Sequence, residues 1–260
     1  MPSPRNTKST FEKANIDMSL TTAGLLPEKG KKLVEIYSEE KDWDKTKKKW
    51  HELRAGKRGS RNSSQTIFGY LKSRLKSGEK ALPSVENLHS ILEKCDSDEE
   101  KAQILYLYLL EDDNLVKYVV SKVMNNSSEE EFDFSTENIR SILNDIEYHN
   151  GQKLDYSDST LNKWIRNFRS LMRDIGVIKS KQKVVGQSPS LGDQVLKVSA
   201  FYSYNLESDN WLDNPTGWKR LFQTSNYWES LIKRLAESQR WQLSEPRGER
   251  TLKPKDSLFN

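Results

Sequence analysis

The stretch from residue 157 to residue 186 constrains the fold of this chain most strongly. Its apolar side chains recur at the spacing of one helical face: Leu161, Trp164, Ile165, Phe168, Leu171, Met172 and Ile175. Ser157, Asp158 or Ser159 can cap the start of such a helix, and Gly176 supplies a left-handed residue at its end. The pattern predicts an amphipathic helix that buries a continuous apolar stripe.

The opposite face of this helix is basic, because Arg166, Arg169 and Arg173 stack nearly opposite the apolar stripe. After the helix, residues 177–178 and 183–185 indicate two short strands around a polar turn. A basic helix followed by a basic hairpin is typical of a winged-helix DNA-binding domain. A core helix with a solvated face, followed by an ordinary hairpin, is the alternative.

Charge is unevenly distributed along the chain, although the formal net charge is only +4. Residues 41–80 have a net charge of +9, residues 81–156 of −11, and residues 157–186 of +5. Two basic blocks separated by an acidic block predict two positive faces, with the intervening helices directed elsewhere.

Composition restricts the cellular setting. The mean hydropathy of −0.85 and the 31% of charged residues indicate a soluble protein. The longest apolar run, 104–110, is too short to cross a bilayer, and the N-terminus has no signal-peptide pattern. The single cysteine, Cys95, excludes an intrachain disulfide and fits a reducing compartment. We therefore expect a cytoplasmic protein with no membrane partner.

Breaks in hydrophobic periodicity predict two domains. Residues 1–17 are expected to form a disordered lead, and residues 18–125 an N-terminal helical domain. The polar segment 125–134 is the predicted linker, and residues 135–260 are expected to form a C-terminal winged-helix-like α+β domain. The predicted fold class is mostly α, with helix-turn-helix or winged-helix-like elements and short β-hairpins.

In the N-terminal domain, basic residues gather around the third predicted helix. A helix starting at Pro27, a lysine-rich helix over 42–54 and a basic Gly/Ser loop precede it, an order that resembles a helix-turn-helix motif with a long connection. One edge of the third helix carries the polar side chains Arg61, Gln65, Lys72 and Lys76.

Near the C-terminus, residues 241–252 alternate apolar and polar positions about a Pro-Arg-Gly turn, which predicts a hairpin after a helix over 225–238. This hairpin is either a second wing or the strand pair that closes a small α+β domain.

The sequence offers no catalytic or metal-binding constellation. His51, His89 and His149 are scattered, and with a single cysteine they lack the spacing of a zinc site. The glycine-containing string at 56–59 lacks the spacing of a phosphate-binding loop. We therefore expect a non-enzymatic protein with no cofactor and no metal.

Several ordered motifs resemble the BrxA proteins of bacteriophage exclusion (BREX) systems. They are LTTAGLLPEKGKKLVEIYSEEKDW, RNSSQTIFGYLKSRLKS and STLNKWIRNFRSLMRDIGVI, followed by FYSYNL, GWKRLF and LIKRLAESQRW. The similarity covers residues 18–255. It implies a mostly helical, non-enzymatic DNA-binding protein encoded beside a methyltransferase, an ATPase and a phosphatase-like component. It also implies an N-terminal part resembling the antitermination factor NusB, and winged-helix-like elements.

The leading hypothesis is a double-stranded DNA-binding accessory protein of a BREX defence system, with other BREX components as expected partners. Two alternatives are an interaction scaffold that docks a basic partner on the acidic block 81–156, and an RNA-binding regulator. Charge and helical geometry, rather than the family, select the predicted DNA contacts: Arg58, Arg61, Gln65, Lys72, Lys76, Lys163, Arg166, Arg169, Arg173, Lys179, Lys181 and Lys183.

Overall fold

The computed structural model confirms a mostly helical chain. It describes residues 10–11, 16, 18–56, 61–127, 131–148, 150–180, 184–245, 249–255 and 258–259. These residues contain eleven α-helices and three two-stranded sheets. None of the described helices is both long enough and apolar enough to span a bilayer.

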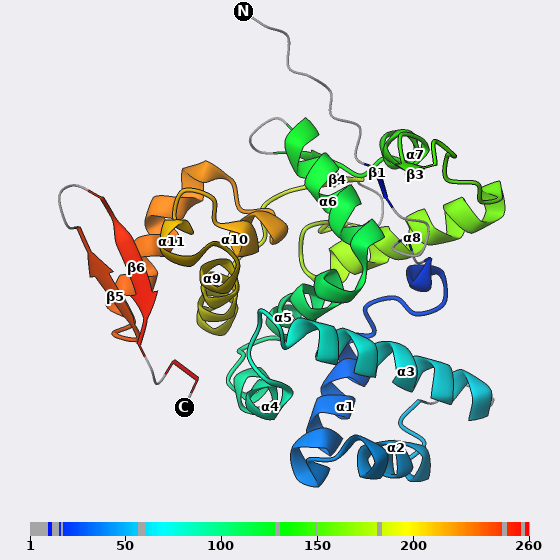
Figure 1. Cartoon of the computed structure of the whole chain (residues 1–260), viewed down its shortest axis with the longest axis horizontal. Coiled ribbons are helices and arrows are strands. Elements are labelled where there is room, and N and C mark those ends of the chain that lie inside the picture. The colour runs from blue at the N-terminus through cyan, green and yellow to red at the C-terminus, as the bar shows by residue number, and fades with distance from the viewer. Residues whose placement is uncertain are drawn as a thin grey trace, which may run out of the picture.

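The first five helices form the lower half of the molecule in Figure 1. They are α1 (Pro27–Glu40), α2 (Trp43–Glu52), α3 (Arg61–Gly78), α4 (Val85–Glu93) and α5 (Asp98–Asp112). Local sequence explains where they begin: Pro27 occupies the first turn of α1, and the Asp42 carboxylate accepts from the Asp44 and Lys45 amides at the start of α2.

Helix α5 is the centre of the fold. Residues 102–110 are all buried, so this helix is buried on every side rather than along one stripe. It contacts α1, α3, α6, α8 and α9. Packing on all sides of α5 joins the N-terminal helices to everything that follows.

The middle of the chain alternates helices and very short strands. It comprises α6 (Asn114–Asn126), β2 (Phe132–Asp133), α7 (Thr136–Asn144), β3 (Glu147–Tyr148), α8 (Asp158–Asp174) and β4 (Val185–Gly186). Strand β3 pairs in parallel with β1 (Thr10–Phe11), and the 3-10 helix η2 (Ser19–Thr21) packs against α8.

The hairpin predicted from residues 177–178 and 183–185 is wrong in its pairing. Strand β4 instead pairs antiparallel with β2, matching Phe132 with Gly186 and Asp133 with Val185. Residues 177–178 form no strand, although Val177 O accepts from the Gln187 amide at 3.0 Å. The partner of β4 lies about fifty residues earlier in the chain, which local periodicity could not reveal.

The segment predicted as a linker is partly core. Phe132 and Phe134 are fully buried, and their rings pack against Phe222 at centroid distances of 5.0 and 5.7 Å. Buried side chains from Ile16 to Leu258 form one hydrophobic cluster. The division into domains at 125–134 stays a prediction.

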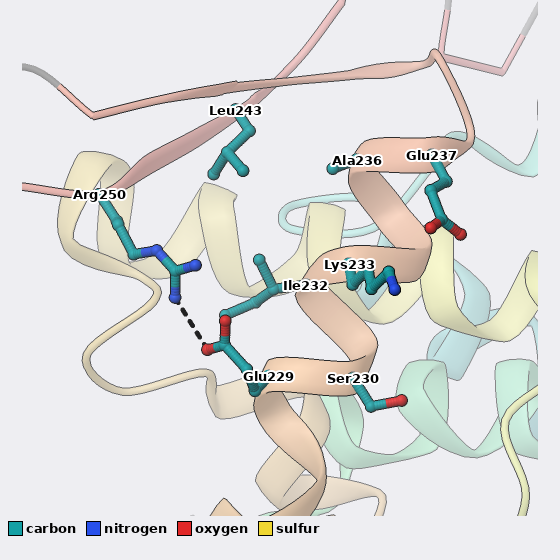
Figure 2. Close-up of a pocket in the computed structure, with 8 residues that line it drawn as sticks. All are labelled: Glu229, Ser230, Ile232, Lys233, Ala236, Glu237, Leu243 and Arg250. Atoms are coloured by element: carbon teal, nitrogen blue, oxygen red, sulfur yellow. Dashed lines mark hydrogen bonds and ion pairs between the residues drawn. The ribbon is translucent and has the colours of Figure 1, made fainter.

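The C-terminal elements lie on the left of Figure 1. They are α9 (Asp193–Glu207), the 3-10 helix η3 (Ser208–Asn210), α10 (Thr216–Arg220), α11 (Ser225–Glu237), β5 (Trp241–Ser244) and β6 (Thr251–Pro254). The hairpin predicted here is confirmed, with β5 and β6 antiparallel and Leu243 opposite Leu252. A cleft of about 630 Å³ lies between α11 and this hairpin. Arg250 pairs with Glu229 at 2.8 Å at this cleft, and Figure 2 shows the two side chains.

A partly buried charge cluster joins this part to the central helix. Glu111, at the end of α5, accepts from Arg220 of α10 at 2.8 Å and lies 3.2 Å from Lys117 of α6. The Tyr202 hydroxyl of α9 donates to the same carboxylate, and the Arg220 guanidinium lies 4.8 Å from the Tyr202 ring centroid. Two cations therefore share one carboxylate where four helices meet.

Candidate nucleic-acid interface

Helix α8 presents a polar face to solvent because its apolar face is fully committed to the core. Ser157 caps its start by accepting from the Thr160 amide at 3.4 Å, as the sequence predicts. Trp164 and Phe168 are fully buried and stacked, with ring centroids 5.0 Å apart. The side chains left exposed on the other face are Ser159, Asn162, Lys163, Arg166 and Ser170. Lys163 and Arg166 are therefore available to an anionic partner.

Arg169 is bound within the chain rather than free on that face. Its Nε donates to the backbone carbonyl of Phe134 at 2.6 Å, and its Nη2 donates to Thr136 Oγ1 at 3.0 Å. Burial lowers the pKa of Arg169, and nearby Glu137 opposes this effect. The sequence placed Arg169 beside Arg166, but the structure directs it towards the segment between β2 and α7.

The last turn of α8 carries a charged pair of adjacent residues. Arg173 is half-buried, and its Nε has no hydrogen-bond partner among the described residues. Burial raises the pKa of Asp174, while Arg173 lowers it. The positive charge of Arg173 is thus partly offset by its own neighbour.

A polar cleft of about 560 Å³ lies between α8 and residues 21–27. Lys163, Ser170 and Asp174 line its α8 side. Asn167 also lines it and donates from Nδ2 to Leu20 O at 2.8 Å, which fixes the 19–24 segment against α8. Asp174 and Lys163, of opposite charge, therefore border the same cleft.

Basic residues after α8 extend the polar surface beyond the end of the helix. Lys179 is exposed and lines a second cleft of about 620 Å³ together with Glu131 and Val185. Lys181 and Lys183 lie outside the described residues.

The second predicted group lies on α3. Gln65 and Lys76 are exposed, and the Nζ of the half-buried Lys72 lies 5.4 Å from the Trp43 ring centroid. Arg58 lies outside the described residues, and Arg61 begins α3 with its side chain undescribed. The structure therefore describes the side chains of three of the five predicted contacts in this group.

Sequence reasoning missed one arginine of α3. Arg74 is buried, and its Nη1 and Nη2 donate to Gly24 O and Ala23 O, both at 2.8 Å. Arg74 lies on the same side of the α3 helical wheel as the apolar residues, and this position could have indicated that it is buried. The 19–24 segment is thus held by Arg74 from α3 and by Asn167 from α8, and it lies between these helices in Figure 1.

Not every lysine of helix α2 is available to an external anion, although the sequence of this helix is lysine-rich. Lys49 pairs with Glu39 and lies 3.2 Å from Glu40, both at the end of α1. Lys45 and Lys47 are exposed. Elsewhere, the described residues hold no group of three or more His, Cys, Asp or Glu side chains that could bind a metal ion.

A family model described as BrxA matches residues 15–198, which is more than half of the chain. The matched region contains α3, α8 and the 19–24 segment, whereas α11 and the C-terminal hairpin lie beyond it. No curated protein and no solved structure matches the chain.

Proposed function

Since the chain belongs to the BrxA family of BREX phage-defence systems, we propose that it is a non-enzymatic accessory protein that binds double-stranded DNA. In this proposal α8 enters the major groove, and Lys163 and Arg166 contact phosphates or guanine edges. The exposed side chains of α3 form a second phosphate-binding surface.

The observation that carries this proposal is the environment of α8. One face is buried in the core, and the other exposes Lys163 and Arg166, beside Asn162, whose Oδ1 accepts from Arg140 Nη2 at 2.8 Å. Lysine and arginine neutralise phosphates, and guanidinium groups also read guanine edges.

The order of elements around α8 supports a winged-helix-like reading. Helix α6, strand β2, helix α7, strand β3, helix α8 and strand β4 follow one another, and β2 pairs antiparallel with β4. In helix-turn-helix proteins the second helix of the pair lies in the major groove, which is the position of α8 after α7. The connection between α7 and α8 is longer than the tight turn of that motif.

The test is a competition experiment at fixed salt among duplex DNA, single-stranded DNA and RNA of equal length. We expect duplex DNA to compete best. Stronger competition by RNA would instead support an RNA-binding regulator. Absence of binding to all three would contradict the proposal and favour a protein scaffold that uses the acidic block 81–156.

Salt dependence tests the electrostatic part separately. If the interface covers about 4–6 phosphates, log affinity should fall linearly with log salt at a slope of about −4 to −5. A slope near zero would contradict phosphate neutralisation as the source of affinity.

A further inference from the structure

We propose that Arg169 is a positioning residue, which holds strand β4 in place against α8 rather than contacting DNA itself. The inference rests on the proposed DNA-binding function and specifies how its surface is assembled. It removes Arg169 from the predicted contacts and gives it a different role at the same site.

A short chain of contacts leads from Arg169 to β4. The Phe134 carbonyl accepts from Arg169 Nε at 2.6 Å, and the Phe134 amide donates to Val184 O at 2.8 Å. Phe134 is thus hydrogen-bonded to α8 through its carbonyl group, and to Val184, the residue before β4, through its amide group. A shift of Phe134 along α8 would therefore strain its hydrogen bond to Val184.

Close packing makes this connection stiff. The Phe134 ring lies 6.0 Å from the Phe168 ring centroid, one position before Arg169 on α8. A Cβ built on Gly186 would lie 2.5 Å from Phe134 Cε2 and 2.8 Å from Val177 Cγ1. Only glycine therefore lets β4 approach this closely, and little room remains for Phe134 to move.

The hydrogen bonds of Arg169 suit a structural role better than contact with a phosphate. Nε and Nη2 point along one edge of the guanidinium, and both are occupied by acceptors of the chain. The planar fork satisfies a carbonyl and a hydroxyl together, whereas the single ammonium of lysine cannot reproduce that geometry. Arg166, three residues earlier, is exposed and serves as a matched comparison.

The experiment compares Arg169→Gln and Arg169→Lys with Arg166→Gln and Arg166→Lys in the full chain. Duplex affinity is measured for all four, and hydrogen exchange is followed at the Phe134 amide. The Lys255 amide, which donates to Arg240 O at 3.0 Å in the distant hairpin region, serves as the internal control.

For the Arg169 variants, we expect both to accelerate Phe134 exchange relative to Lys255 and to weaken duplex binding by about tenfold, because neither replacement restores the fork. For the Arg166 variants, exchange should stay at the wild-type rate. Arg166→Lys should keep most of the affinity because it keeps the charge, and Arg166→Gln should lose it.

The inference would be overturned if Arg169→Lys bound duplex DNA like wild type and its Phe134 amide exchanged at the wild-type rate. A positive charge at residue 169 would then be enough, without the geometry of the guanidinium group. If the wild-type chain binds no duplex DNA, the proposed function fails, and Phe134 exchange in Arg169→Lys still decides whether Arg169 holds β4. Should Arg169→Gln unfold, the milder Arg169→Lys supplies the same comparison.

Discussion

Arg74 of α3 and Asn167 of α8 donate to backbone carbonyls of the same short segment, at Ala23 and Gly24 for Arg74 and at Leu20 for Asn167. All three hydrogen bonds are 2.8 Å long. The two helices that carry the predicted DNA contacts are thereby tied to one another through residues that lie far from both in sequence.

The first prediction concerns Arg74. Replacing it with Ala leaves two carbonyl acceptors at the 19–24 segment without their donor. We expect Arg74→Ala to lower the free energy of unfolding by about 3 kcal/mol, measured by urea titration. Lys76→Ala, on the exposed face of the same helix, should stay within about 0.5 kcal/mol of wild type. Equal effects of the two substitutions would contradict the role given to Arg74.

The second prediction concerns the shared carboxylate. Glu111→Gln removes the carboxylate that the partly buried Lys117 and Arg220 share, while an amide oxygen still accepts from Tyr202. Removing one partner of a buried ion pair costs about 3–5 kcal/mol, so the urea midpoint should fall sharply. Glu229→Gln breaks the exposed pair with Arg250 and should leave the midpoint almost unchanged. A small effect at Glu111 would show that water screens this cluster.

The contrast between helix α8 and its connections shows what the sequence could predict. Its bounds, its Ser157 cap and the left-handed Gly176, with a φ of 78°, follow from local periodicity and are confirmed. Both acceptors of Arg74, and the acceptor of Arg169 Nε, are backbone carbonyls, which every residue possesses. Such partners leave no trace in residue type, so both roles required the structure.

Long-range pairings were missed for a related reason. Strands β2 and β4 contain two residues each, too few to show an alternating pattern, and Glu111 and Arg220 are 109 residues apart. Polar composition around residues 125–134 indicated a linker, while the buried Phe132 and Phe134 gave the opposite signal. The predicted NusB-like character of the N-terminal part stays a prediction.

The third prediction concerns thiol chemistry. Burial raises the pKa of Cys95 to about 12, and nearby Glu100 adds to the effect. Because the thiolate is the reactive form, the folded protein should not react with Ellman's reagent at about pH 8. The same protein in guanidinium chloride should release one equivalent of chromophore. Rapid reaction of the folded chain would show that α4 opens readily around Cys95.

The fourth prediction links stability to pH at Asp174. Because burial raises its folded pKa above the ordinary 3.8, the stability it contributes is present below that value and is lost as the pH rises through the folded pKa. Asp174→Asn should therefore be more stable than wild type at about pH 7, which thermal melting would show as a higher melting temperature. The two proteins should converge near about pH 3, where the carboxyl group is protonated in both states.

The same substitution should strengthen DNA binding, because it removes a negative charge from the cleft that Lys163 borders. Lower stability of Asp174→Asn at neutral pH would mean that attraction between Asp174 and Arg173 outweighs the cost of burial.

The last prediction tests whether α8 or α3 is the main DNA contact. Lys163→Gln/Arg166→Gln removes two exposed charges from α8 without touching its buried face, so thermal melting should not change. If each side chain neutralises one phosphate, the slope of log affinity against log salt should become shallower by about 2.

Lys233→Gln/Lys255→Gln is the matched control, since it removes the same charge from the C-terminal elements, where Lys233 borders the cleft of Figure 2. This control should keep the wild-type slope, because charges that do not contact the duplex act only through the screened field of the protein. An unchanged slope in the α8 variant, together with a shallower slope in Gln65→Ala/Lys72→Gln/Lys76→Gln, would transfer the main contact to α3. Helix α8 would then serve to hold the 19–24 segment through Asn167.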